Sequence, residues 1–337
     1  MAHTTEAVAP GKTPTVGSGE HSARRLGAFL CWAVVFADIG TSVYYTPGIL
    51  YTQHGIGDLA GLFVTLTLVV FLLLTLKYAE VSVRFPEGGG VVTVSARGLN
   101  PWAGAVGGMF ILVDYFLTSA ISSLSGVQYF QTLVPALQPI VIQLTITLIL
   151  VGLLGLLNWY GIRESAVVSA TIAVAAFVSD VLILLFILAK VPLTVIGKVF
   201  QTMLTGHHLT TPILLTGYAG AFLAFSGLES ISQLSPVMRA PRKRTVSIAL
   251  LIVVLTVGLT SPLLTIFSTT LLTHPELMAQ TALAAPHTTP DPNQFISLLA
   301  FAGGGRVLEV LTAVTASTLL LFASNTAIIG AYHVFLA

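Results

Sequence analysis

The chain has 337 residues, of which 55% are hydrophobic and only 8% are charged. Soluble domains carry about 25% charged residues, so this composition excludes an ordinary soluble protein and indicates an integral membrane protein of the helical type. The formal net charge of +1 gives no sign of nucleic-acid binding, and the single cysteine, Cys31, excludes a disulfide framework and a cysteine metal site.

Eight apolar runs follow a polar leader. The leader, residues 1–26, is rich in Gly, Pro, Ser and Thr, so we expect it to be disordered and cytoplasmic. A helix needs ~20 apolar residues to cross a bilayer. The expected membrane helices are 27–52, 57–82, 102–133, 137–157, 164–189, 212–235, 245–270 and 306–335. The sequence therefore predicts an all-α, multi-pass membrane protein with eight helices, placed in the plasma membrane.

The basic residues divide unevenly between the two sides of this predicted topology. With a cytoplasmic N-terminus, the inner side holds Lys12, Arg24, Arg25, Lys77, Arg84, Arg97, Arg163, Arg239, Arg242, Lys243 and Arg244. The outer side holds only Lys190, Lys198 and Arg306. Cytoplasmic loops carry an excess of Lys and Arg, so this count supports the cytoplasmic N-terminus.

The first apolar run contains polar residues at its centre, in the stretch FADIGTSVYYTPG (36–48). A carboxylate such as Asp38 is costly at membrane depth, and a Gly-Thr-Ser step followed by Pro47 weakens helical hydrogen bonding. Carbonyl groups freed in this way are tolerated only where they face protein or a hydrophilic cavity. The pattern predicts a broken first helix with a polar site at its break.

The loops between the apolar runs show no phosphate-binding or metal-binding motif. The inner loop 83–100 contains a glycine cluster that lacks the Lys or Asp of a phosphate-binding loop, so we expect a tight re-entrant turn. The outer loops 190–212 and 270–305 include short amphipathic pieces. No carboxylate or cysteine is spaced to complete a metal site there. We therefore interpret the histidines of these loops as plain loop residues: His207, His208, His274 and His287.

Two further runs carry acids. In the third run, Asp114, Thr118 and Ser122 follow one another at intervals of four residues and therefore share a helix face, with Tyr115 beside it. In the fifth run, Asp180 lies nearer the outer end among apolar neighbours, and we interpret it as a capped or interfacial acid.

The sixth run repeats the pattern of the first. Small residues at mid-span lead to Ser226, Gly227 and Glu229, and a proline follows, so we expect a second break at Gly227. Discontinuous helices at matching positions of inverted repeats are typical of secondary transporters. The sequence thus predicts a first five-helix repeat at 27–189 and an incomplete second repeat, with three helices, at 212–337.

Asp38, Asp114 and Glu229 lie inside predicted spans, whereas the Lys and Arg residues fall in the leader, in loops or near span ends. Buried carboxylates need a partner, so these acids carry a proton, hold a cation supplied from outside, or bond to backbone and hydroxyl groups. Hydroxyls and freed carbonyls form an oxygen cage suited to a monovalent cation. The sequence shows no carboxylate cluster of the kind that holds Ca²⁺ or Mg²⁺.

These motifs resemble the amino acid–polyamine–organocation (APC) superfamily, whose members have a LeuT-like inverted-repeat fold of five plus five helices. The shared features are the broken first helix, PEGGG, NWYGIRESA (158–166) and FSGLES…SPVMRAPRKR (225–244). Within it, DIGTS (38–42) resembles the KUP potassium uptake proteins. The acids, tyrosines and hydroxyls of the first, third and sixth helices resemble the Kim-type potassium–proton symporters.

This resemblance implies a transporter, not an enzyme, that imports K⁺ together with H⁺ and needs no cofactor. The positions implied to line the ion site are Asp38, Gly40, Thr41, Tyr45, Tyr115, Thr118, Ser122 and Ser226, with Asp38, Tyr45, Thr118, Ser122 and Ser226 as metal-ion ligands. Asp114 and Glu229 are the implied proton carriers.

Three alternatives stay open. The first is an APC permease for amino acids or amines, and the second is a membrane-embedded enzyme, which would need a nucleophile or metal cluster at a membrane surface. The third is a non-transporting fragment, because the superfamily has ten core helices and this chain ends with the eighth expected helix. The missing part is expected in a longer sequence or in another chain, and a homo-oligomer is also open. The expected partners are the lipid bilayer and a small cation.

Overall fold

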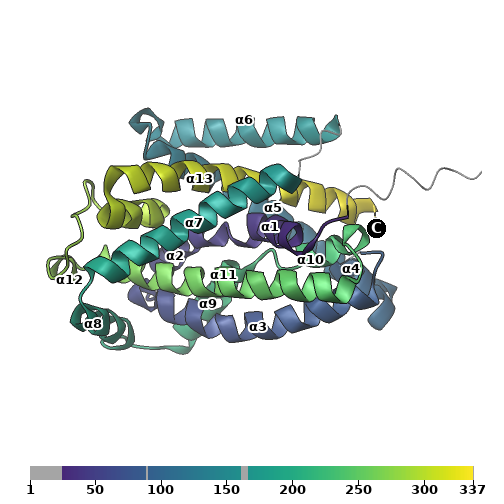
Figure 1. The fold of residues 1–337 in the computed structure, drawn as a ribbon, viewed down its shortest axis with the longest axis horizontal. Helices are drawn as coiled ribbons and strands as arrows, with labels where there is room; N and C mark the ends of the chain where they lie inside the picture. Colours follow the sequence, from purple (N-terminus) through teal and green to yellow (C-terminus); the bar gives the residue numbers. More distant parts are fainter. Residues whose placement is uncertain (1–24, 89, 161–165, 337) are drawn as a thin grey trace, which may run out of the picture.

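The computed structural model describes residues 25–88, 90–160 and 166–336, and the expected disorder of 1–26 lies almost wholly outside them. Helices dominate this part of the chain (Figure 1). The longer ones are α1 (Ala28–Ile39), α2 (Ser42–Thr52), α3 (Ala60–Arg84), α4 (Gly90–Gly98), α5 (Pro101–Gln131), α6 (Ile140–Trp159), α7 (Ala166–Lys190), α8 (Leu193–Leu204), α9 (Thr211–Ala221), α11 (Arg242–Leu271) and α13 (Phe295–Leu336). Short turns of helix are η1 (Gly57–Leu59), η2 (Pro135–Leu137), η3 (Phe222–Phe225), α10 (Ser230–Gln233), η4 (Ser235–Val237), α12 (Pro275–Met278) and η5 (Pro292–Gln294).

Eight stretches of the described chain are long and apolar enough to cross a membrane, which confirms the predicted class and the predicted number of spans. They are Ala28–Thr52, Gly57–Arg84, Pro101–Gln131, Ile140–Trp159, Ala166–Lys190, Thr211–Gln233, Arg242–Leu271 and Pro292–Tyr332. The last span differs most from expectation, because α13 begins at Phe295, before the predicted start of the helix at residue 306. Gly305 has φ 69° and ψ −165°, a conformation that glycine tolerates, and it kinks α13 where the expected helix begins.

The first span lies at the centre of the bundle. Helix α1 packs against α7 and α11, and α2 packs against α11 as well. The rings of Trp32 and Phe36 both meet Phe177 of α7 edge to face, an arrangement that aromatic pairs favour. In contrast, α6 lies at the edge of the molecule beside α13 (Figure 1) and exposes Leu148 and Ile149. The broken helix is therefore enclosed by protein, and α6 is suited to face lipid.

The two ends of the bundle are built differently. Helices α8 and α12 gather at one end, whereas α4 and the C-terminal end of the chain lie at the other (Figure 1). Helix α8 is amphipathic and buries Val195, Val199 and Met203. The interpretation of 83–100 as a re-entrant turn alone was wrong. The turn at Gly88, with φ 85°, leads into helix α4, and α4 packs on α5 because Gly104 leaves room for Ala96.

The start of α1 is joined to the segment after α10 by backbone hydrogen bonds. The amide of Leu26 donates to the carbonyl of Val237 over 2.8 Å, and the amide of Arg239 donates to the carbonyl of Leu26 over 2.9 Å. A parallel bridge pairs Leu26 with Met238. These bonds connect one end of the first broken helix to one end of the sixth-span helix.

Candidate functional site: carboxylates at two helix breaks

The first helix is interrupted between α1 and α2, as predicted, but the interruption is a tightened turn and not an unwound segment. The amide of Tyr44 donates to the carbonyl of Thr41 over 3.0 Å, an i to i−3 bond in place of the α-helical one. The Thr41 hydroxyl donates to the Asp38 carbonyl over 2.6 Å, and the Ser42 hydroxyl donates to the Ile39 carbonyl over 2.7 Å. Side-chain hydroxyls thus satisfy carbonyls that the tightened turn releases.

The sixth span is truly unwound, and Gly227 is the reason. Ser226 is extended, with ψ 145°, and Gly227 has φ 101°, which side chains rarely adopt. A Cβ atom on Gly227 would lie 2.9 Å from Cγ of Asp38. The Ser42 hydroxyl also donates to the Ala224 carbonyl over 2.6 Å. The predicted break at Gly227 is present, and it brings the sixth span directly against the acid of the first.

Three carboxyl groups meet at these breaks. Asp38 and Glu229 are 6% and 9% exposed, and their carboxyl groups interact electrostatically with each other and with Asp114. The Ser230 hydroxyl interacts with Asp38, and the Ser226 hydroxyl donates to Oδ1 of Asp114 over 3.3 Å. Within the described residues, none of the three acids has a Lys, Arg or His nitrogen within 4.0 Å.

Hydroxyl groups surround the cluster. Tyr45, which is 5% exposed, interacts with the hydroxyls of Thr41 and Ser122. It also interacts electrostatically with Asp38 and Asp114. Oγ of Ser122 is fully buried and makes no hydrogen bond of ordinary geometry. Buried polar atoms are nearly always satisfied, so this oxygen is suited to a small ligand.

The remaining predicted residues differ in how closely they approach the cluster. Tyr115 interacts electrostatically with all three acids, and its hydroxyl accepts a hydrogen bond from Nε2 of Gln233. Thr118 is half-buried on the same face of α5, but the structure shows no hydrogen bond from it to the acids. Gly40 faces Phe36, because a Cβ there would lie 2.5 Å from the Phe36 carbonyl oxygen.

Glu229 and Ser226 do not pair with each other, although a continuous helix would place them three positions apart on one face. The carboxyl group of Glu229 lies near the backbone amides of Gly227 and of Glu229 itself, whereas the Ser226 hydroxyl donates to Asp114. Sequence reasoning also missed Ser230 and Gln233, because both meet their partners across the break and no local pattern indicates these contacts.

Two histidines interpreted as plain loop residues contact carboxylates from other elements. Nε2 of His274 lies 3.5 Å from Oδ2 of Asp58. Nε2 of His287 lies 3.5 Å from Oε1 of Glu309, a fully buried acid that Arg306 also pairs with over 2.8 Å. The described residues hold no group of three or more His, Cys, Asp and Glu side chains that could bind a metal ion.

Unpaired buried acids at two helix breaks, enclosed by apolar membrane-length helices, define the class as a multi-pass membrane protein of the transporter type. The chain belongs to the amino acid permease family, whose model matches residues 29–337. This membership, together with the relatives described next, confirms the resemblance to the APC superfamily.

The chain is similar to several curated potassium transport proteins. It is 31% identical over 186 residues to the potassium transporter KimA of Bacillus subtilis, covering 52% of this chain and 29% of the relative. It is 33% identical over 174 residues to a probable potassium transport system protein Kup of Xanthomonas oryzae, covering 44% of this chain and 26% of the relative. Kup 1 of Ralstonia nicotianae is 29% identical over 223 residues, covering 59% and 35%. The chain therefore spans only about a third of the length of the relatives it matches.

Proposed function

We propose that this chain imports K⁺ together with H⁺, with the ion held at the two helix breaks. The observation that carries this proposal is the contact between Asp38 and Gly227, which places a buried carboxyl group without a basic partner at an unwound backbone. An ion that carries its own positive charge would compensate this acid. The potassium transporters among the relatives support the choice of cation.

The residues around Asp38 favour a small monovalent cation over an amino acid. Tyr45, Ser122 and Ser226 supply hydroxyl oxygens, and Ser122 and Tyr45 are closed off from solvent. Asp38 would repel the carboxylate of an amino acid, which transporters of this kind bind at helix ends free of acids. The proposed ion ligands are Asp38, Tyr45, Thr118, Ser122 and Ser226, with Thr41 and Tyr115 beside them, whereas Gly40 faces Phe36.

The purified chain in liposomes tests this function. We expect uptake of ⁸⁶Rb⁺ that K⁺ competes away and that a mixture of amino acids and polyamines leaves unchanged. Accumulation of a labelled amino acid or amine, without competition by K⁺, would support the permease alternative instead. Liposomes that contain the lipid alone serve as the control for leakage.

The helix breaks also support an inverted repeat with a LeuT-like arrangement, in which 27–189 is the first repeat and 212–337 is part of the second. The interruptions fall in the first and sixth spans, the matching positions of two five-helix units. We propose the cytoplasmic side of the plasma membrane for the end that carries α4 and residues 239–244.

The orientation predicts which lysines an impermeant amine reagent reaches in intact cells. Lys198 and Lys243 are both exposed, and they belong to α8 and to the start of α11. We expect labelling of Lys198 from outside and labelling of Lys243 only after the membrane is opened. The opposite order would reverse the topology.

Proton coupling is proposed for Asp114 and Glu229, because both are carboxyl groups near the proposed ion site and neither has a basic partner in the described part of the chain. A bound cation favours the ionised form of the acid, and protonation of the acid disfavours binding of the cation. The binding of the cation and of the proton is therefore linked reciprocally. We expect Glu229→Gln to keep part of the ion binding and to flatten the dependence of uptake on pH between about pH 5 and 8. Asp114→Asn is expected to have the smaller effect, since Asp114 is more exposed. Initial uptake rates measured against pH check this, and unchanged profiles in both variants would place the proton path elsewhere.

A further inference from the structure

A fourth membrane acid lies apart from the cluster. Asp180 of α7 is 0% exposed, so it is not an interfacial acid. It lies ten residues, or about 15 Å along the helix, from Lys190 at the helix end. Oδ1 accepts a hydrogen bond from the hydroxyl of Tyr44 over 3.1 Å, and Oδ2 has no hydrogen-bond partner.

Nothing around Asp180 in the described structure compensates a negative charge. The titratable groups that face it are the hydroxyls of Tyr44 on α2 and Tyr129 on α5. Both are neutral, and Tyr129 donates to the Tyr44 carbonyl over 2.8 Å. On the other helices packed against α7, Asp38 of α1 faces Gly227, and Glu309 of α13 pairs with Arg306 and His287. Burying an ionised carboxylate with one neutral donor is far costlier than burying the neutral acid.

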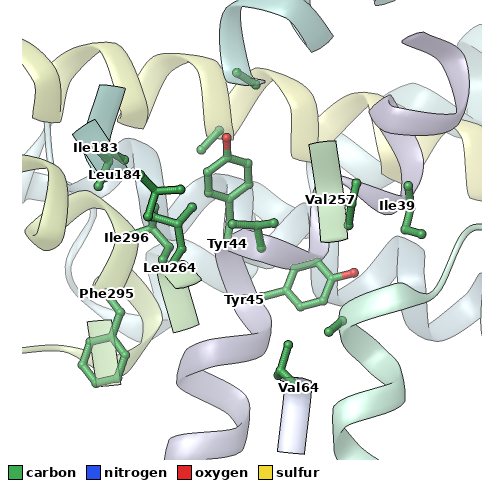
Figure 2. Close-up of a cluster of buried hydrophobic side chains, with 14 of the residues drawn as sticks. Ile39, Tyr44, Tyr45, Val64, Ile183, Leu184, Val257, Leu264, Phe295 and Ile296 are labelled. Carbon is green, nitrogen blue, oxygen red and sulfur yellow. The ribbon is translucent and has the colours of Figure 1, made fainter. Parts of the chain in front are cut away.

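We propose that Asp180 and Tyr44 form a second proton-binding site, whose occupancy is linked to the position of α2. The inference rests on the proposed coupling of K⁺ transport to H⁺ and adds a proton site outside the carboxylate cluster. The proton resides on the carboxyl group, and Oδ1 accepts from Tyr44. Ile183 and Leu184, about one helical turn after Asp180 on α7, belong to the buried apolar core (Figure 2), a setting that suits a neutral carboxyl group better than a dehydrated K⁺.

The link to the ion site passes through two adjacent tyrosines. Figure 2 shows the rings of Tyr44 and Tyr45 leaving α2 in different directions. Tyr44 reaches Asp180, whereas Tyr45 reaches Thr41 and Ser122 beside the carboxylate cluster. Because Tyr44 and Tyr45 are adjacent residues of α2, a movement of α2 that withdraws Tyr45 from the proposed ion site would also move Tyr44. Separation of Tyr44 from Asp180 would admit water and release the proton, so proton binding and the closed ion site favour each other.

Infrared difference spectroscopy of the purified chain tests the proton site without requiring transport. We expect a protonated-carboxyl carbonyl band at neutral pH that disappears in Asp180→Asn and remains in Glu276→Gln, a control at an exposed position of α12. In liposomes, Asp180→Asn is expected to keep ⁸⁶Rb⁺ uptake at neutral pH within about threefold and to lower the number of protons moved per ion. An unchanged band and an unchanged proton count would overturn the inference while leaving the proposed function intact.

Tyr44→Phe provides the second variant, because it keeps the acid and removes the hydrogen bond to its Oδ1. A donor to a carboxylate favours the ionised form, so its removal should move the pH at which the infrared band disappears to a higher value. If the band titrates at the same pH as in the wild type, Tyr44 is not part of the site. Absence of ⁸⁶Rb⁺ uptake in the wild type would contradict the proposed function, and the infrared result would still decide the proton site.

Discussion

Asp38→Asn is expected to weaken binding of K⁺ by about 100-fold or more. The carboxyl group of Asp38 lies against Gly227, and the residue is 6% exposed. Removing one partner of a buried charge pair costs about 3 kcal/mol or more, and each 1.4 kcal/mol is about tenfold in affinity. Asparagine has nearly the same shape, so the packing against Gly227 is kept while the charge is lost. Binding of ⁸⁶Rb⁺ to the purified variant measures the effect.

A matched carboxyl-to-amide change at the surface serves as the control. Glu80 pairs with Lys77 and Arg84 at the end of α3, where the side chains are exposed. Exposed ion pairs contribute at most about 1 kcal/mol, so Glu80→Gln should bind the ion as the wild type does. Wild-type affinity in Asp38→Asn would remove Asp38 from the ion site, and equal losses in both variants would indicate a nonspecific effect of charge.

Gly227→Ala is expected to reduce both stability and uptake. The φ of 101° at this position costs a residue with a Cβ roughly 1–2 kcal/mol. The added Cβ would also lie 2.9 Å from Cγ of Asp38, so the sixth span must move away from the first. We expect the melting temperature in detergent to fall by about 2 °C or more and ⁸⁶Rb⁺ uptake to fall by at least about tenfold, since the proposed ion site lies at this contact.

Gly197→Ala separates a requirement at this site from a general effect of replacing glycine. Gly197 lies within α8, and a Cβ there would meet nothing within 4 Å. Alanine favours a helix by about 0.5–1 kcal/mol over glycine, so this control should be as stable as the wild type or slightly more stable, with unchanged uptake. If Gly227→Ala behaves in the same way, the close approach of the two broken helices is not needed for transport.

The spans and the break positions could be predicted from the sequence because hydropathy and backbone chemistry are local properties. Apolar runs of membrane length predicted the eight spans, and the helical period placed Asp114 and Ser122 on one face of α5. The polar residues around Asp38 and Gly227 located both interruptions. In 83–100 the glycines indicated the turn, but the short helix α4 after it was missed, since its stability depends on packing against α5.

Only the tertiary structure decided which side chains meet. A continuous helix would place Ser226 on the same face as Glu229, yet the unwound backbone between them directs the Ser226 hydroxyl to Asp114 instead. Asp180 reads as an interfacial acid along α7, but the packing of α2 buries it under Tyr44. Such contacts join residues more than 100 positions apart, as Ser226 and Asp114 show, and they depend on how helices cross and rotate. A one-dimensional pattern places an acid within a span but carries no information about the helix that will cover it.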